Sequence, residues 1–148
     1  NTLIHDYEIF KRYPHSIDIN VKRTKFLAKI KHDKNFFLIG SNGKLSSIKH
    51  EDKSNYLPFI FGKPEIDQFL KFKQKIDDSK FNYKDINNLF FFPSDRWDIQ
   101  LKNDQLIKLS SKNIKKTLDL VSDFLLENDI NTIKIVDARI QNQIILDD

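Results

Sequence analysis

The sequence has 148 residues, of which 39% are hydrophobic and thirteen are Phe, enough to pack one domain or one domain with part of another. It contains no Cys, so disulfides and thiolate metal sites are excluded. The 25 Lys and Arg exceed the 21 Asp and Glu by only four, and the two signs alternate along the chain. Nucleic-acid binders concentrate basic residues on one face, so a solvated surface is favoured for this chain.

No stretch approaches the roughly 18–20 apolar residues that span a bilayer. No signal peptide opens the chain, and its first residue is Asn1 rather than Met. We therefore expect an excised or processed part of a longer protein, from which an anchor or targeting segment can be missing.

The first forty-five residues predict a β-meander. A short strand from His5 ends at Pro14, because proline cannot continue a hydrogen-bonded ladder. Ile17, Ile19 and Val21 alternate with polar residues, as do Phe26, Ala28 and Ile30. A further strand, Phe36 to Ile39, is closed by Asn42-Gly43, a strong hairpin signal because both turn positions favour positive φ.

The middle of the chain predicts a loop and then a helix. The apolar segment Tyr56 to Lys63 contains Pro58 and Gly62 and is expected to be a loop packed on the core. A helix is expected from Pro64 to Asp78, because proline suits the first helical turn and one face is apolar. That face carries Ile66, Phe69, Leu70 and Ile76.

The last sixty residues predict a hairpin, a second helix and a final hairpin. Leu89 to Phe92 leads to Trp97, Ile99 and Leu101, which alternate with polar residues, and the chain returns through Leu106 to Leu109. A helix is expected after a Ser110 or Ser111 cap and before Asn128. Its apolar stripe is Ile114, Thr117, Leu118, Val121, Phe124 and Leu125.

Together these elements indicate the α+β class, with a mostly antiparallel sheet of hairpins covered by two amphipathic helices. The final hairpin is expected from Ile133, Ile135 and Val136 through a turn at Gln141-Asn142 to Ile144, Ile145 and Leu146.

The sequence offers little that resembles a catalytic centre. His5, His15, His32 and His50 are isolated, and no glycine-rich phosphate loop or nucleophile elbow is present. Asp95 and Asp98 flank Trp97, but nothing else supports a carboxylate pair for sugar cleavage. Trp97 itself is expected in the core, because it alternates with Ile99 and Leu101. We expect neither an enzyme nor a cofactor or metal site.

The terminal hairpin is the main candidate for a binding surface. A terminal strand often lies at a sheet edge, where unpaired backbone groups can accept a partner's strand. The hairpin is apolar and carries Arg139, whose guanidinium can pair bidentately with carboxylates. Alternatively, the hairpin completes the core and Arg139 pairs with a local acid. The residues alone do not decide between these two interpretations.

Several segments resemble the FtsQ/DivIB family of bacterial division proteins, in the family's order. Tyr7 to Ile30 resembles the passage from the family's POTRA domain into its β domain, although Lys22, Lys25 and Ile30 replace a Glu, a Pro and an aromatic residue. "FFLIGSNGKL" and "LPFIFGKP" are similar to a family hairpin and to an "LPxLxGP" segment.

Two later segments resemble the same family. The run after Arg96 matches at Trp97, Leu101 and Asn103, and the terminal run matches at Val136, Asp137 and Arg139. Ile140 and Gln143 stand where the family has Tyr and Gly.

The resemblance implies that residues 1–30 are the C-terminal part of a truncated POTRA domain and residues 31–148 a β domain of FtsQ type. It also implies a single-pass inner-membrane protein with this region in the periplasm. Such a protein is a non-enzymatic scaffold that recruits the FtsB–FtsL pair by β-strand addition at its C-terminal edge.

The partner-binding residues implied by the resemblance are Arg139, Ile140, Gln141, Asn142, Gln143, Ile144, Ile145 and Leu146, with Arg96 added from the basic position near Trp97. Two other classes stay open: another envelope adaptor that binds proteins, and a domain that binds or hydrolyses peptidoglycan.

Overall fold

The computed structural model describes residues 4–12, 16–48, 56–129 and 131–147, with side chains from residue 23 onward. A two-stranded sheet pairs β1 with β2, and a nine-stranded sheet has the order β11-β10-β9-β8-β7-β6-β3-β4-β5. The strands are β1 Ile4–Arg12, β2 Ser16–Arg23, β3 Phe26–His32, β4 Asn35–Gly40, β5 Leu45–Ser47, β6 Phe59–Phe61, β7 Ile86–Phe92, β8 Arg96–Leu101, β9 Leu106–Leu109, β10 Ile135–Ala138 and β11 Ile145–Asp147. The helices are α1 Ile66–Asp77, the 3₁₀ turn η1 Tyr83–Asp85 and α2 Ile114–Glu127.

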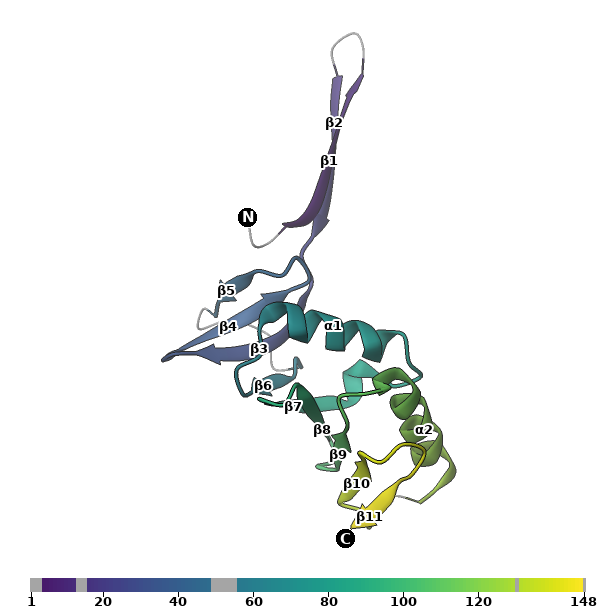
Figure 1. Cartoon of the computed structure of the whole chain (residues 1–148). Coiled ribbons are helices and arrows are strands. Elements are labelled where there is room, and N and C mark those ends of the chain that lie inside the picture. The colour runs from purple at the N-terminus through teal and green to yellow at the C-terminus, as the bar shows by residue number, and fades with distance from the viewer. Residues whose placement is uncertain (1–3, 13–15, 49–55, 130, 148) are drawn as a thin grey trace.

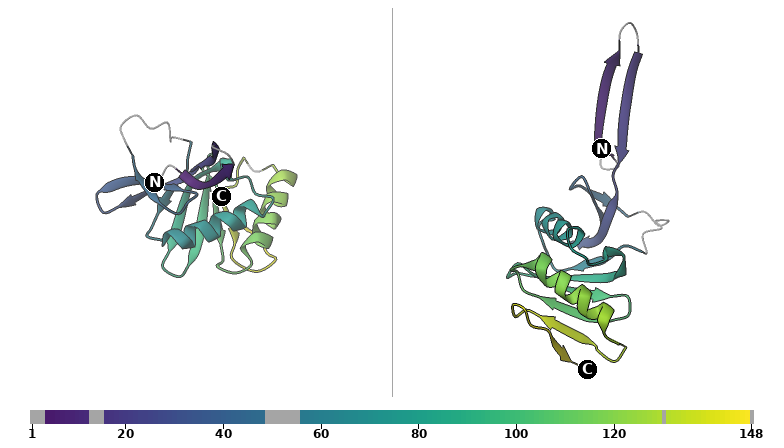
Figure 2. Two further views of the ribbon diagram at one scale, coloured as in Figure 1. Left: turned by 90° about the horizontal axis from the view of Figure 1, so that it is seen from above. Right: turned by 90° about the vertical axis from the view of Figure 1, so that its right-hand side faces the viewer.

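The α+β class and the mostly antiparallel sheet are confirmed. Five neighbouring pairs of the described large sheet are antiparallel, and three are parallel: β3 with β6, β6 with β7, and β9 with β10. Both helices lie on the same face of this sheet (Figures 1 and 2). No helix of the described residues is long and apolar enough to cross a membrane.

The hairpin of β1 and β2 projects away from the nine-stranded sheet (Figure 1). The division into a POTRA part, residues 1–30, and a β domain, residues 31–148, stays a prediction. Strand β3 crosses that boundary, because it starts at Phe26 and pairs with β4 and β6 of the large sheet.

The expectation of a loop over Tyr56 to Lys63 is wrong in its centre. Phe59–Phe61 forms β6, which lies parallel between β3 and β7. Gly62 then leaves the sheet at φ +100°, where an added Cβ would lie 2.4 Å from the carbonyl oxygen of Phe91. A three-residue strand bounded by Pro and Gly has no local signal, because only its distant neighbours make it a strand.

Helix α1 begins two residues later than expected and packs through a stripe that includes Phe72. Its start is fixed by Gln68, whose Oε1 accepts a hydrogen bond from the backbone N–H of Glu65 at 2.8 Å. Phe72 stacks on Trp97 of β8 with ring centroids 4.6 Å apart and planes 2° from parallel. Trp97 is buried, which confirms its expected place in the core.

Helix α2 ends as expected, but neither serine caps its start. Asn113 is the N-cap, with φ +54° and no side-chain capping bond. The Ser110 hydroxyl accepts from the backbone N–H of Lys112 at 3.0 Å, so it closes a turn before the helix. At the other end, Asn128 Nδ2 donates to the carbonyl of Phe124 at 2.9 Å.

Tyr83 joins the helix layer to β3. Its hydroxyl donates to the carbonyl of Leu27 at 2.6 Å, and Lys73 Nζ of α1 lies 4.4 Å from its ring centroid. Burial raises the pKa of Tyr83 far above its usual value, so the hydroxyl stays protonated and remains a donor.

The stacked pair predicts a large effect of one substitution in α1. Phe72→Ala should cost about 3–5 kcal/mol of unfolding free energy, because it opens a cavity beside Trp97. The measurement is urea unfolding followed by the fluorescence of Trp97, the single Trp of the chain. Phe36→Ala, the same deletion at a half-exposed ring, is the control and should cost much less. Equal losses would contradict the proposed role of the stack.

Candidate partner-binding edge

The C-terminal strand lies at one end of the nine-stranded sheet. Among the described strands, β11 pairs only with β10, antiparallel, with Val136 opposite Leu146 and Asp137 opposite Ile145. Its other side therefore presents backbone groups with no ladder partner from the described chain. The condition for strand addition, an edge not flanked on both sides, is met at β11.

Only part of the expected edge segment is a strand. Residues 139–144, Arg139 to Ile144, form the connection between β10 and β11, and Gln143 N–H donates to the carbonyl of Ile140 at 3.1 Å. Asn142 takes φ +59° in this turn. The edge strand is thus Ile145–Asp147, and β10 is covered by β9 on one side and β11 on the other.

Apolar side chains of the edge remain exposed. Ile145 and Leu146 are 51% and 44% exposed, and Ile140 in the loop is 53% exposed. Leu146 shares the helix-covered face with buried Val136, because directly opposed residues point the same way. Ile145 lies on the other face, so an added strand could bury apolar surface on both sides.

Arg139 is already paired within the chain. Its Nε donates to Asp137 Oδ1 at 2.9 Å and its NH2 donates to Oδ2 at 2.7 Å. The side-chain hydrogen bond from Arg139 lowers the pKa of Asp137, so the pair persists at neutral pH and is lost in acid. The structure thus shows the local-acid contact that the sequence left as an alternative. Half of the Arg139 side chain still faces solvent.

Arg96 and Arg139 face one buried carboxylate, that of Asp98. Arg96 lies on β8, with its guanidinium carbon 4.2 Å from the ring centroid of Phe92 and NH2 3.6 Å from Asp98 Oδ2. Burial raises the pKa of Asp98, and the charge of Arg96, a backbone hydrogen bond from Leu109 and the charges of Lys108 and Arg139 act against that rise.

Asp98 lies on the sheet face opposite the helices. Trp97 and Ile99 point into the core, so Asp98 between them points away from it. It lies opposite Lys108 of β9, which in turn lies opposite Asp137 of β10. The alternation of apolar and polar residues in the sequence can place Asp98 on this face. The presence of Lys108 and Asp137 beside it depends on the strand order, which the sequence pattern does not show.

The two candidate catalytic carboxylates lie on different sides of the sheet. Asp95 accepts a long hydrogen bond from Gln68 of α1 at 3.4 Å, on the helix side, whereas Asp98 faces away from the helices. The two carboxylates therefore do not converge on one substrate position. Within the described part of the chain, no group of three His, Cys, Asp or Glu residues could hold a metal.

Residues 28–139 match the family model described as "Cell division protein FtsQ/DivIB, C-terminal". The chain belongs to the FtsQ/DivIB family. The match covers the sheet from β3 to Arg139 and stops before β11. Membership in this family of cell-division proteins confirms the resemblance drawn from the sequence motifs.

Two known FtsQ/DivIB proteins are similar over most of the chain. "Cell division protein FtsQ" of Rhizobium radiobacter is 22% identical over 142 residues, which cover 95% of this chain and 68% of that protein. The solved structure of the major extracytoplasmic domain of the trans isomer of DivIB from Geobacillus stearothermophilus is 14% identical. It covers 73% of this chain and 98% of that chain, with a TM-score of 0.48.

The motif residues shared with the FtsQ/DivIB family occupy structural positions. Trp97 and Val136 are core residues, Leu57 and Pro58 are buried before β6, and Gly62 is the point where the chain leaves the sheet. The fold therefore accounts for the presence of these residue types at the motif positions. The partner roles of Arg139 and the loop stay predictions.

The buried carboxylate predicts an unusual pH dependence. A raised pKa means that the folded state holds the Asp98 proton more tightly than the unfolded chain, so ionisation costs stability as pH rises above about 4. Asp98→Asn should therefore melt a few degrees higher than wild type at pH 7, and the difference should shrink towards pH 4. Thermal unfolding by circular dichroism over this range is the measurement. Asp85→Asn, at an exposed site, is the control. A Tm of Asp98→Asn below that of wild type at pH 7 would contradict the expected stabilisation.

Proposed function

We propose that this chain is the periplasmic part of a division scaffold that recruits an FtsB–FtsL type pair by β-strand addition at β11. The observation that carries the proposal is the position of β11 at the end of the sheet, where β10 is its one neighbour among the described strands. Membership in a family of division proteins supports this function over another envelope adaptor or a peptidoglycan-binding or hydrolysing domain. The proposal includes no catalytic step and no cofactor.

The proposed location follows from the same family. We place this region in the periplasm, joined to the inner membrane by one helix that is not among the 148 residues of the chain. The partner would then approach from the periplasmic side and add its strand next to Ile145–Asp147.

The edge strand by itself supplies modest affinity. About three new ladder bonds at ~1 kcal/mol each, with burial of two half-exposed aliphatic side chains at ~1 kcal/mol each, give roughly 5 kcal/mol. A micromolar complex needs about 8 kcal/mol, and ordering a flexible partner adds a further cost. The partner must therefore make contacts beyond β11.

The loop and the start of α2 can supply these contacts. Ile140 is exposed beside the edge, and Arg139 keeps donors that face solvent. A cavity of about 170 Å³ lies between the start of α2 and the loop, lined in part by Lys112, Thr117 and Arg139. A carboxylate of the partner at this cavity would meet two cationic side chains.

Loss of the Arg139 side chain should weaken partner binding without unfolding the domain. We expect Arg139→Ala to reduce the affinity for an FtsB-type peptide several-fold in an isothermal titration, while Tm changes little because the side chain is half exposed. Lys84→Ala, at an exposed position on η1, is the matched control. Unchanged affinity of Arg139→Ala would contradict the anchor.

Strand addition also predicts a backbone signature that side-chain docking would not give. On binding the same peptide, amide hydrogen exchange should slow within Ile145–Asp147 at those residues whose N–H groups point away from β10, because these groups become ladder donors. The opposite edge strand, Leu45–Ser47, is the internal control and should exchange as before. Binding without slower exchange at β11 would exclude strand addition even if Arg139 contributes.

A further inference from the structure

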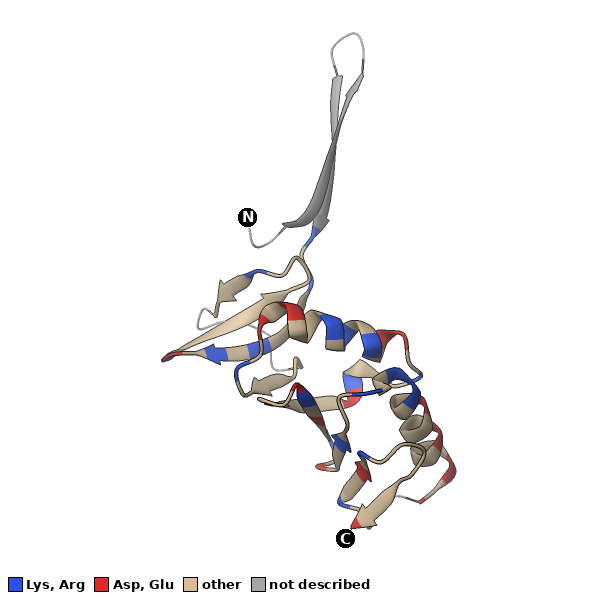
Figure 3. Cartoon of the chain, viewed as in Figure 1, with Lys and Arg blue, Asp and Glu red and all other residues tan. Residues whose placement is uncertain are grey.

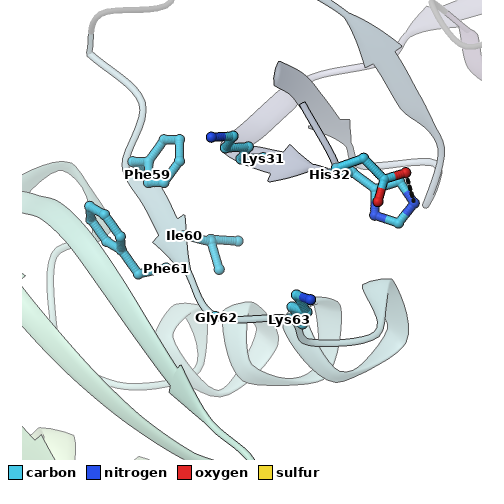
Figure 4. A pocket seen from close by; sticks show the side chains of 8 residues that line it. Lys31, His32, Phe59, Ile60, Phe61, Gly62 and Lys63 are labelled. Carbon is cyan, nitrogen blue, oxygen red and sulfur yellow. Dashed lines mark ion pairs between the residues drawn. The ribbon is translucent and has the colours of Figure 1, made fainter. Parts of the chain in front are cut away.

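A row of phenylalanines crosses the sheet face that the helices leave uncovered. Phe61 of β6 lies opposite Phe90 of β7, and Phe59 lies two residues before Phe61 on the same face. Phe36 of β4 continues the row. Figure 4 shows the rings of Phe59 and Phe61 on one side of β6 and Ile60, a core residue, on the other.

These rings pack on one another but remain partly exposed. The centroids of Phe36 and Phe59 are 6.1 Å apart, those of Phe59 and Phe61 are 4.8 Å apart, and those of Phe61 and Phe90 are 5.0 Å apart. Phe36 and Phe61 are 49% and 46% exposed. The rings are tilted or stacked against each other, so they form no flat platform for sugar rings. They offer an apolar surface to side chains.

Among the described residues, the two lysines beside the row form no ion pair with an acid, and the two acids near this face each lie close to a basic side chain. Lys31 Nζ lies 5.7 Å from the ring centroid of Phe36, and neither Lys31 nor Lys63 makes an ion pair with a described residue. Asp33 lies 3.9 Å from His32, and Asp98 lies beside Arg96. The row therefore presents positive charge to a ligand.

A crevice opens at the end of the row, where β3 and β6 part. Their pairing ends at Ile30 and Ile60, and a cavity of about 450 Å³ follows. Its walls include Phe59, Phe61, Lys31 and Lys63 (Figure 4). This volume suits one or two apolar side chains, and the two lysines on its walls outnumber its one carboxylate, Asp33, which favours an acidic ligand.

We propose that the phenylalanine row and this crevice form a second protein-docking surface, which takes an acidic segment carrying aromatic or aliphatic residues. Elsewhere charges are mixed: both helices carry acidic as well as basic residues (Figure 3). An anionic membrane is the less suitable occupant, because such surfaces usually need four to eight clustered cations. The nearest strand of the row, β7, lies four strand spacings, roughly 19 Å, from β11, so the row is a site separate from the edge.

The test uses the 148-residue chain and random copolymers as defined probes. A copolymer of Glu and Tyr should bind and shift the NMR signals of Phe36, Phe59, Phe61 and Phe90, whereas polyglutamate should bind at least several-fold more weakly. Lys31→Glu combined with Lys63→Glu should reduce the affinity at least fivefold, and Phe61→Ser should do the same. Lys84→Glu and Leu126→Ser, exposed residues outside the row, are the matched controls and should bind like wild type.

Several results would overturn the proposal. One is equal binding of a Lys–Tyr copolymer, and another is polyglutamate binding as tightly as the Glu–Tyr copolymer. A third is sedimentation of the protein with phosphatidylglycerol vesicles in the absence of copolymer binding. Signal changes confined to Ile145–Asp147 would also contradict it. Because the edge and the row report through different residues, failure at the row leaves the proposed function of β11 untouched.

Discussion

The stack of Phe72 on Trp97 joins α1 to the centre of the large sheet, and the distribution of exposed surface follows from it. Trp97 also contacts Phe91 on the neighbouring strand, so one helix is fixed to two strands. Two helices cannot cover nine strands on both faces. With both of them on one side, the described residues place no helix over the opposite face or over the outer edges of β11 and β5 (Figures 1 and 2).

The two exposed regions differ in the kind of recognition that they support. At β11 the available groups are backbone donors and acceptors, which give affinity with little dependence on the partner's sequence. The loop and the start of α2 can then add selectivity through charge. On the phenylalanine row the backbone is already paired in the sheet, so any recognition there depends on side chains. With both regions available, the chain could bind two partner segments at the same time.

The charged residues near the edge are arranged so that few of them are free. Asp137 neutralises Arg139, and Asp98 lies buried among Arg96, Lys108 and Arg139. A partner that approaches Arg139 therefore meets a cluster of three cationic side chains and two carboxylates rather than an isolated cation. This favours moderate affinity, because each new contact competes with one already present.

The sequence by itself determined the elements with strong local patterns: the two helices, the core position of Trp97 and the class of the fold. It also located the turn at Asn42-Gly43, although only Gly43 takes a positive φ there. It also identified the family through motifs that turn out to be largely structural, such as Gly62. Tertiary structure alone decided the rest. β6 is a strand because β3 and β7 flank it. Ser110 does not cap α2, because its hydroxyl closes the turn before the helix. The edge strand is only Ile145–Asp147, shorter than the segment expected from the sequence. The phenylalanine row combines residues from three strands that are far apart in the chain. No local sequence pattern predicts that they are neighbours, because the order of the strands in the sheet determines it.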